Sequence, residues 1–181
     1  AFKVDSENAE WVTNAAGIDF NHSYGAGLVD AAAAVQESFR VNSANEFLGE
    51  AVQHSRSAFF SSDSQGTAEE PTGVVPDNTG QSLLATFDMT KGSDGTPFEN
   101  LRVEHVEFNA TIITPNRADL EVVLISPNGT QSILAETNAD HEEDSIFFWN
   151  FMTVRNWGEG SAGTWLVRVT DRISGNQAIL N

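Results

Sequence analysis

The sequence predicts a mainly β protein whose strands form a sandwich, preceded by one short helical segment. Short apolar or alternating runs recur from residue 83 to residue 171, and Gly, Pro and Asn residues that form turns separate them. An Ala-rich run that begins at residue 31 is typical of a helix. Together these patterns favour an all-β sandwich with a helical segment before it.

The helical segment is expected to begin after Asp30. The carboxylate of Asp30 can accept a free backbone N–H of the first turn, and it lies favourably at the positive end of the helix dipole. The helix has only about three turns and carries mostly Ala side chains, so it buries too little apolar area to be stable by itself. We therefore expect it to pack against a further part of the protein.

The strands differ in their patterns. Residues 106–112 alternate, with apolar side chains on one face and polar ones on the other, which indicates a half-buried strand. The run 119–126 is apolar on both faces and indicates a central strand, and the turn around Gly129 joins it to its partner strand. Strands are expected at 83–87, 106–112, 119–126, 132–136, 145–154 and 163–171.

The charge and composition narrow the classes of partner. The chain has 9 Lys and Arg against 26 Asp and Glu, a formal net charge of -17. Nucleic acid and anionic membrane surfaces would be repelled. No apolar run reaches the roughly 20 residues that span a bilayer, and there is no cysteine for a disulfide or a thiolate site. The acidic excess fits high solubility, a salty habitat or divalent-cation binding.

No residue of the chain is assigned a catalytic role. A serine nucleophile needs a histidine base that an acid orients. The four histidines are His22, His54, His105 and His141, and none lies in such a context; no Gly-x-Ser-x-Gly motif occurs. We expect structural or solvated roles for all four.

The best candidate for a metal site is the acidic loop at residues 140–144. Asp140, Glu142 and Asp144 offer hard oxygen ligands of the kind that calcium prefers. The spacing is not that of an EF-hand, and a solvated acidic turn is the alternative.

Five segments carry a resemblance to a known family. The stretch GIDFNHSYGAGLVDAAAAV at 17–35 resembles the last segment of subtilisin-like catalytic domains of the kexin and proprotein-convertase type. The segments 119–134, 148–159 and 162–171 resemble, in order and spacing, the signature segments of the P domain that follows it. VVPDN at 74–78 is similar to the start of bacterial P domains.

The resemblance implies an organisation. Residues 1–40 would be the C-terminal tail of an α/β subtilisin-like catalytic domain, 41–70 a linker or the start of the P domain, and 71–181 a jelly-roll-like P-domain sandwich. The family pattern continues into one more strand with a Trp, so the sandwich either lacks its last strand or closes differently. The catalytic triad would lie upstream.

The resemblance also implies a function. The parent would be a secreted or periplasmic serine endopeptidase with the calcium dependence that is usual in this family, and the absence of cysteine favours a bacterial origin. The P domain would stabilise and regulate its own catalytic domain, which binds the peptide or protein substrate. The alternative is a carbohydrate- or surface-binding sandwich that uses Trp149, Trp157 and Trp165; we expect these three side chains in the core instead.

Overall fold

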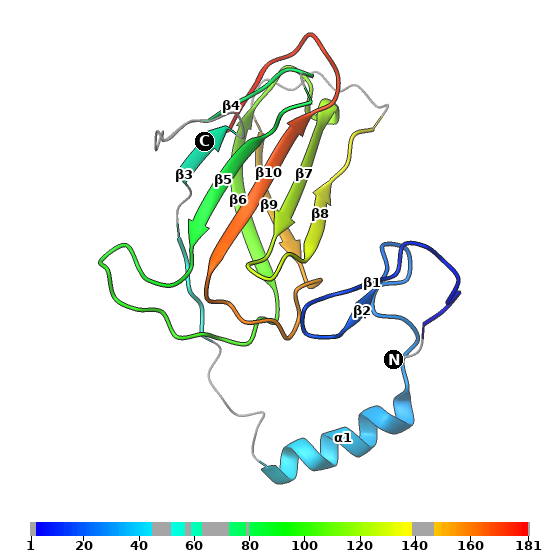
Figure 1. Cartoon of the computed structure of the whole chain (residues 1–181). Coiled ribbons are helices and arrows are strands. Elements are labelled where there is room, and N and C mark those ends of the chain that lie inside the picture. Colours follow the sequence, from blue (N-terminus) through cyan, green and yellow to red (C-terminus); the bar gives the residue numbers. More distant parts are fainter. Residues whose placement is uncertain are drawn as a thin grey trace. The chain divides into compact units, whose positions relative to one another are not determined.

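The computed structural model describes residues 3–44, 52–56, 59–62, 73–78, 80–138 and 147–180 (Figure 1). The chain divides into two compact units, Ala1–Gln53 and His54–Asn181. The division at residues 40 and 70 that the sequence suggested stays a prediction.

The first unit begins with a small antiparallel sheet of β1 (Val12–Thr13) and β2 (Asp19–Phe20). Two buried asparagines shape its turns. The Oδ1 atom of Asn14 accepts the backbone N–H of Ala16 at 3.0 Å and of Ile18 at 2.9 Å. Asparagine is favoured in such a turn because its short side chain can accept hydrogen bonds from nearby backbone N–H groups.

The helix α1 (Ala31–Ala44) follows, and its predicted N-cap is confirmed. The Oδ1 atom of Asp30 accepts the N–H of Ala33 at 2.9 Å. Side chains from 31 to 40 are exposed within this chain, including Val35 at 55% and Phe39 at 69%. The structure thus agrees with the expectation that α1 buries little apolar area here.

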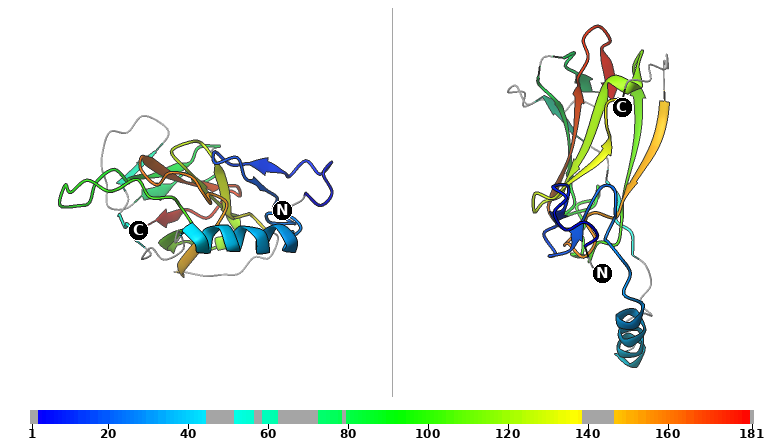
Figure 2. Two further views of the ribbon diagram at one scale, coloured as in Figure 1. Left: turned by 90° about the horizontal axis from the view of Figure 1, so that it is seen from below. Right: turned by 90° about the vertical axis from the view of Figure 1, so that its right-hand side faces the viewer.

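The second unit contains two antiparallel sheets that face each other in two layers (Figure 2, right). The five-stranded sheet has the order β3-β5-β10-β7-β8, and the four-stranded sheet has the order β4-β11-β6-β9. The strands are β3 (Phe59–Ser62), β4 (Gly73–Val75), β5 (Leu83–Asp88), β6 (Val106–Ile113), β7 (Leu120–Ile125), β8 (Gln131–Ala135), β9 (Phe147–Thr153), β10 (Thr164–Asp171) and β11 (Ala178–Leu180). The mainly β sandwich is confirmed.

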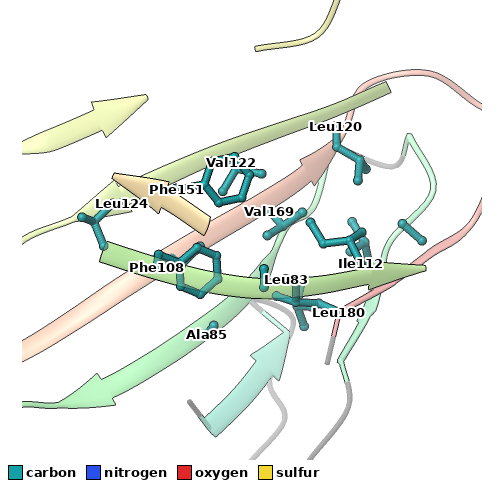
Figure 3. Packing of buried hydrophobic residues seen from close by; sticks show 14 of the residues in the cluster. Leu83, Ala85, Phe108, Ile112, Leu120, Val122, Leu124, Phe151, Val169 and Leu180 are labelled. Carbon is teal, nitrogen blue, oxygen red and sulfur yellow. The ribbon is translucent and has the colours of Figure 1, made fainter. Parts of the chain in front are cut away.

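The core lies between the two sheets (Figure 3). Alternation in β6 sends Phe108, Ala110 and Ile112 into it, as the sequence predicted. In β7, Val122 and Leu124 belong to the core, and Val123 on the opposite face is buried as well, as the apolar run predicted; the strand pairs with β10 on one side and β8 on the other. The buried cluster comprises Val75, Leu83, Ala85, Val103, Phe108, Ala110, Ile112, Leu120, Val122, Leu124, Phe151, Trp165, Val167, Val169, Ala178 and Leu180.

Two connections fix the edges of the sandwich. The turn between β7 and β8 has Gly129 at φ 88°, a left-handed conformation that glycine adopts without strain. In the four-stranded sheet β11 pairs with β4 on one side and with β6 on the other. Among the described strands, β8 is the last strand of the five-stranded sheet and β9 is the last strand of the four-stranded sheet.

None of the described helices has the length and apolar character needed to cross a membrane.

Candidate docking surface

The sequence suggested one candidate site for chemistry, the acidic loop at residues 140–144. Asp140, Glu142 and Asp144 lie outside the described residues, so the calcium prediction for that loop stays a prediction. In the described ranges, no three His, Cys, Asp or Glu side chains form a ready-made metal cage.

Of the three described histidines, one stacks on an aromatic ring and two are exposed. His54 stacks on Phe98 with ring centroids 4.1 Å apart. The Nε2 atom of His105 lies 3.8 Å from Oε1 of Glu107, and both side chains are exposed. His22 is exposed as well, and His141 lies outside the described residues. Within the described part of the chain, none of these histidines is hydrogen-bonded to a serine hydroxyl.

The three tryptophans of the sandwich have two different environments. Trp165 is 4% exposed, and its Nε1 donates to the carbonyl of Ser161 at 2.8 Å. Trp149 is 53% exposed and Trp157 is 43% exposed. The prediction of a core position is confirmed for Trp165 and is wrong for Trp149 and Trp157.

The position of each tryptophan in the sheets explains the difference. Trp165 lies in β10, which has β5 on one side and β7 on the other. Trp149 lies opposite Ala110 in β9, which is the last described strand of its sheet, so one side of the ring has no neighbouring strand. Trp157 follows β9 in a turn, where strand alternation does not apply.

Further apolar side chains are exposed along the same stretch. Phe148 is 78% exposed, Met152 is 61% exposed and Val154 is 44% exposed. We define the β9 edge surface as Phe148, Trp149, Met152, Val154 and Trp157. Figure 2 (right) shows β9 in orange along the outer side of the sandwich. Sequence reasoning missed Phe148 and Met152, although alternation with the buried Phe151 places both on the opposite face of the strand.

The β9 edge surface combines two features that favour contact with another protein surface. Phe148 and Met152 share the outer face of β9, whereas Trp149 lies on the same face as Phe151 and is exposed at the open edge of the strand. Several large apolar side chains exposed so close together are unusual for a surface that meets only water. Its strand also has one edge that no described strand covers, where backbone N–H and C=O groups can pair. The surface can therefore bury apolar area and does not itself supply a nucleophile or a base.

Comparison with known proteins gives the family. Residues 103–181 match the model of the proprotein convertase P-domain. These residues belong to the P-domain family of the proprotein convertases. The match includes the whole β9 edge surface, so this surface is part of the P domain.

Longer relatives match both units of the chain. A dibasic-processing endoprotease of Schizosaccharomyces pombe is 32% identical over 178 residues, which cover 96% of this chain and 23% of the relative. Proprotein convertase subtilisin/kexin type 5 of Homo sapiens is 34% identical over 164 residues, or 90% of this chain and 8% of the relative. The chain thus spans less than a quarter of these relatives, and its resemblance to the kexin and proprotein-convertase family is confirmed.

A solved structure shows the same fold. The serine protease of Aeromonas sobria, solved in complex with its chaperone, aligns with a TM-score of 0.54 at 17% identity, over 94% of this chain and 32% of that chain. At this identity the likeness concerns the fold alone. The P domain and the segment before it thus have the fold of the corresponding part of a serine protease.

Proposed function

We propose that this chain is the non-catalytic C-terminal part of a secreted subtilisin-like serine endopeptidase of the kexin type. In this role the P domain stabilises and regulates the catalytic domain, which lies upstream and carries the triad and the substrate site. The observation that carries the proposal is the alignment with a dibasic-processing endoprotease over 96% of this chain, since it includes both units.

The exposed side chains of the first unit support this role. Leu28 is 61% exposed and Val29 is 76% exposed, immediately before α1, and Phe39 within α1 is 69% exposed. A segment with so many exposed apolar side chains gains stability when a larger body covers it, at about 1.5–3 kcal/mol for each fully buried large side chain. On this proposal the covering body is the rest of the catalytic domain.

The β9 edge surface supports the same role for the P domain. It offers three large apolar side chains on one strand, with exposures of 78%, 53% and 61% for Phe148, Trp149 and Met152. We assign its partner as an apolar face of the same protein's catalytic domain. Burial of this surface in the contact would raise the stability of both domains together.

The proposal extends to the setting of the protein. A secreted or periplasmic location, substrate peptides bound by the upstream domain and calcium dependence of the whole protease are proposed from the family. A chain without cysteine folds in such compartments without a disulfide. The bacterial origin suggested above is part of this proposal.

The test compares Phe148→Ser and Met152→Ser in two contexts: the 181-residue chain and the longer protease that would contain it. In the chain both side chains face water, so each substitution should change the free energy of unfolding by less than about 0.5 kcal/mol. In the protease each should lower the Tm of the catalytic domain by roughly 3 °C or more, because buried apolar area is lost.

Ile133→Ser is the matched control. Ile133 is 43% exposed and lies in β8, the last described strand of the other sheet. This variant should leave the Tm of the protease unchanged. Equal effects of Ile133→Ser and Met152→Ser in the protease, or no effect of either β9 variant, would contradict the assigned contact.

A carbohydrate-binding role is the second candidate, and the exposure of Trp149 and Trp157 favours it. Exposed aromatic rings on a sandwich can stack on sugar rings. A polysaccharide pull-down with the chain, repeated with Trp149→Ala and Trp157→Ala, separates the two roles. Retention that depends on both rings would support this second role, whereas no retention would leave the docking role as the explanation of their exposure.

A further inference from the structure

Three acidic residues lie at one end of the sandwich, at the opposite end of the strands from the turn at Gly129. Asp171 ends β10, Asp119 directly precedes β7, and Asp77 follows β4 (Figure 1). The antiparallel pairing of β10 with β7 brings the first two together: Asp171 is the register partner of Leu120, and the N–H of Arg172 donates to the carbonyl of Asp119 at 2.9 Å.

Two of these carboxylates are buried. Asp119 and Asp171 are each 1% exposed. Asp119 accepts from Nδ2 of Asn116 at 2.8 Å on Oδ1 and from Nδ2 of Asn176 at 3.3 Å on Oδ2. Asp171 accepts the N–H of Ile173 at 3.0 Å on Oδ1. Its Oδ2 atom is buried and has no hydrogen-bond partner in the described part of the chain.

The buried charge of Asp171 is not offset within the described residues. Burial is the largest cause that raises the pKa of this carboxyl; the Ile173 N–H lowers it, and the negative charges of Asp77 and Asp119 raise it again. The nearby guanidinium of Arg172 instead pairs with Glu121 at 2.9 Å. Because an ionised carboxylate in an apolar setting is costly without a positive partner, this end of the sandwich favours a bound cation.

We propose that Asp119 and Asp171 form a divalent-cation site, with calcium as the ion. The free Oδ2 atom of Asp171 would be one ligand and a carboxylate oxygen of Asp119 another. This site is distinct from the acidic loop at residues 140–144.

Neutral oxygens would complete the coordination. Calcium takes about six to eight oxygen ligands in flexible geometry, including amide carbonyls, backbone carbonyls and water. Asn116 and Asn176 bring side-chain amides to Asp119, and Asp77 adds negative charge nearby. Asp77 and Asn176 are half-buried, so the site is reached from solvent on their side. Magnesium, which requires a near-ideal octahedron, suits this irregular set of loops less well.

The test is calorimetric unfolding of the 181-residue chain at about pH 7, first in EDTA and then with increasing calcium chloride. Ligand bound only to the folded state raises the Tm, and a site with a Kd of about 10⁻⁴–10⁻³ M should give a rise of roughly 5 °C at about 10 mM calcium. Asp171→Asn keeps the shape of the side chain, removes its charge and should abolish the rise. Asn176→Ser should raise the calcium concentration of half-effect about tenfold.

Matched controls identify the site. The combined variant Asp140→Asn, Glu142→Gln and Asp144→Asn should keep the calcium-dependent rise, and sodium chloride of equal ionic strength should not reproduce it. The proposal is overturned if calcium leaves the Tm of the unmodified chain unchanged. It is also overturned if the loop variant loses the rise while Asp171→Asn or Asn176→Ser keeps it in full.

Discussion

At the scale of single residues, Gly129 and Gly163 hold backbone conformations with positive φ that residues with a side chain rarely adopt. Gly163 has φ 133°, and a Cβ atom built there would lie 2.7 Å from Cβ of Pro127. Gly129 has φ 88° with nothing within 4 Å of such an atom. Both positions disfavour other residues by conformation, and only Gly163 adds a steric contact with a rigid ring.

This difference predicts that substitution by alanine lowers the free energy of unfolding more at Gly163 than at Gly129. Gly129→Ala should lower the free energy of unfolding by about 1–2 kcal/mol, because alanine resists the left-handed region. Gly163→Ala should cost about 1 kcal/mol or more beyond that, because Pro127 must also move. Urea unfolding of the two variants measures the difference; equal losses would show that the contact with Pro127 contributes nothing.

Residue environments were only partly predictable from the sequence. Alternation within a strand shows which side chains share a face, and it correctly predicted the burial of Phe108, Ile112 and Trp165. It does not show whether a strand is central or last in its sheet, which is why Trp149 was expected in the core. The burial of Asp119 and Asp171 escaped prediction because they come together only through the register of β7 with β10.

At the scale of elements, the beginning of α1 depends on one side chain. Asp30→Ala removes the acceptor for the N–H of Ala33 and should cost the helix about 1 kcal/mol. Far-UV circular dichroism should show less helix, whereas the unfolding transition of the sandwich should stay in place because it belongs to a separate compact unit. Asp30→Asn keeps an acceptor and is the control; a shifted sandwich transition in Asp30→Ala would contradict the independence of the two units.

The end of β5 provides a pH-dependent interaction. The Oδ1 atom of Asp88 accepts the hydroxyl of Thr90 at 2.5 Å and its N–H at 3.0 Å. The hydroxyl of Thr90 is the largest cause that lowers the pKa of Asp88 from its ordinary value of 3.8. A lowered pKa stabilises the folded state above that value, and the contribution disappears as the pH falls through the pKa in the folded state.

We therefore expect the Tm difference between the unmodified chain and Asp88→Asn to be largest above about pH 5 and to shrink below about pH 4. Thr90→Val should reduce this pH dependence too, since it removes the main donor. The effect is small because Asp88 is accessible to solvent. A difference that stays constant from neutral pH to about pH 3 would contradict this role of Asp88.

Strand order was not predictable from the sequence, although most strands were. The runs at 83–87, 106–112 and 163–171 correspond to β5, β6 and β10 because apolar periodicity is a local property. The sheets instead pair strands far apart in the chain, such as β10 with β5 and β11 with β4. Short strands such as β4 and β11 carry too few residues for a periodic pattern.

At the scale of the whole molecule, the two units differ in how far they bury their own apolar side chains. The sandwich has a continuous core that both sheets share, whereas the described helix of the first unit has exposed Val35 and Phe39. This contrast supports the proposed role, in which the P domain folds around its own core and residues 1–53 would depend on a larger body. We propose that the sandwich in turn stabilises that body.

The most direct measurement compares the thermal inactivation of peptidase activity in the longer protease with that of the same protein ended after Gln53. Removal of residues 54–181 should abolish recovery of active enzyme or shorten its half-life at least several-fold at a fixed temperature. Equal half-lives and equal yields for the two proteins would contradict it.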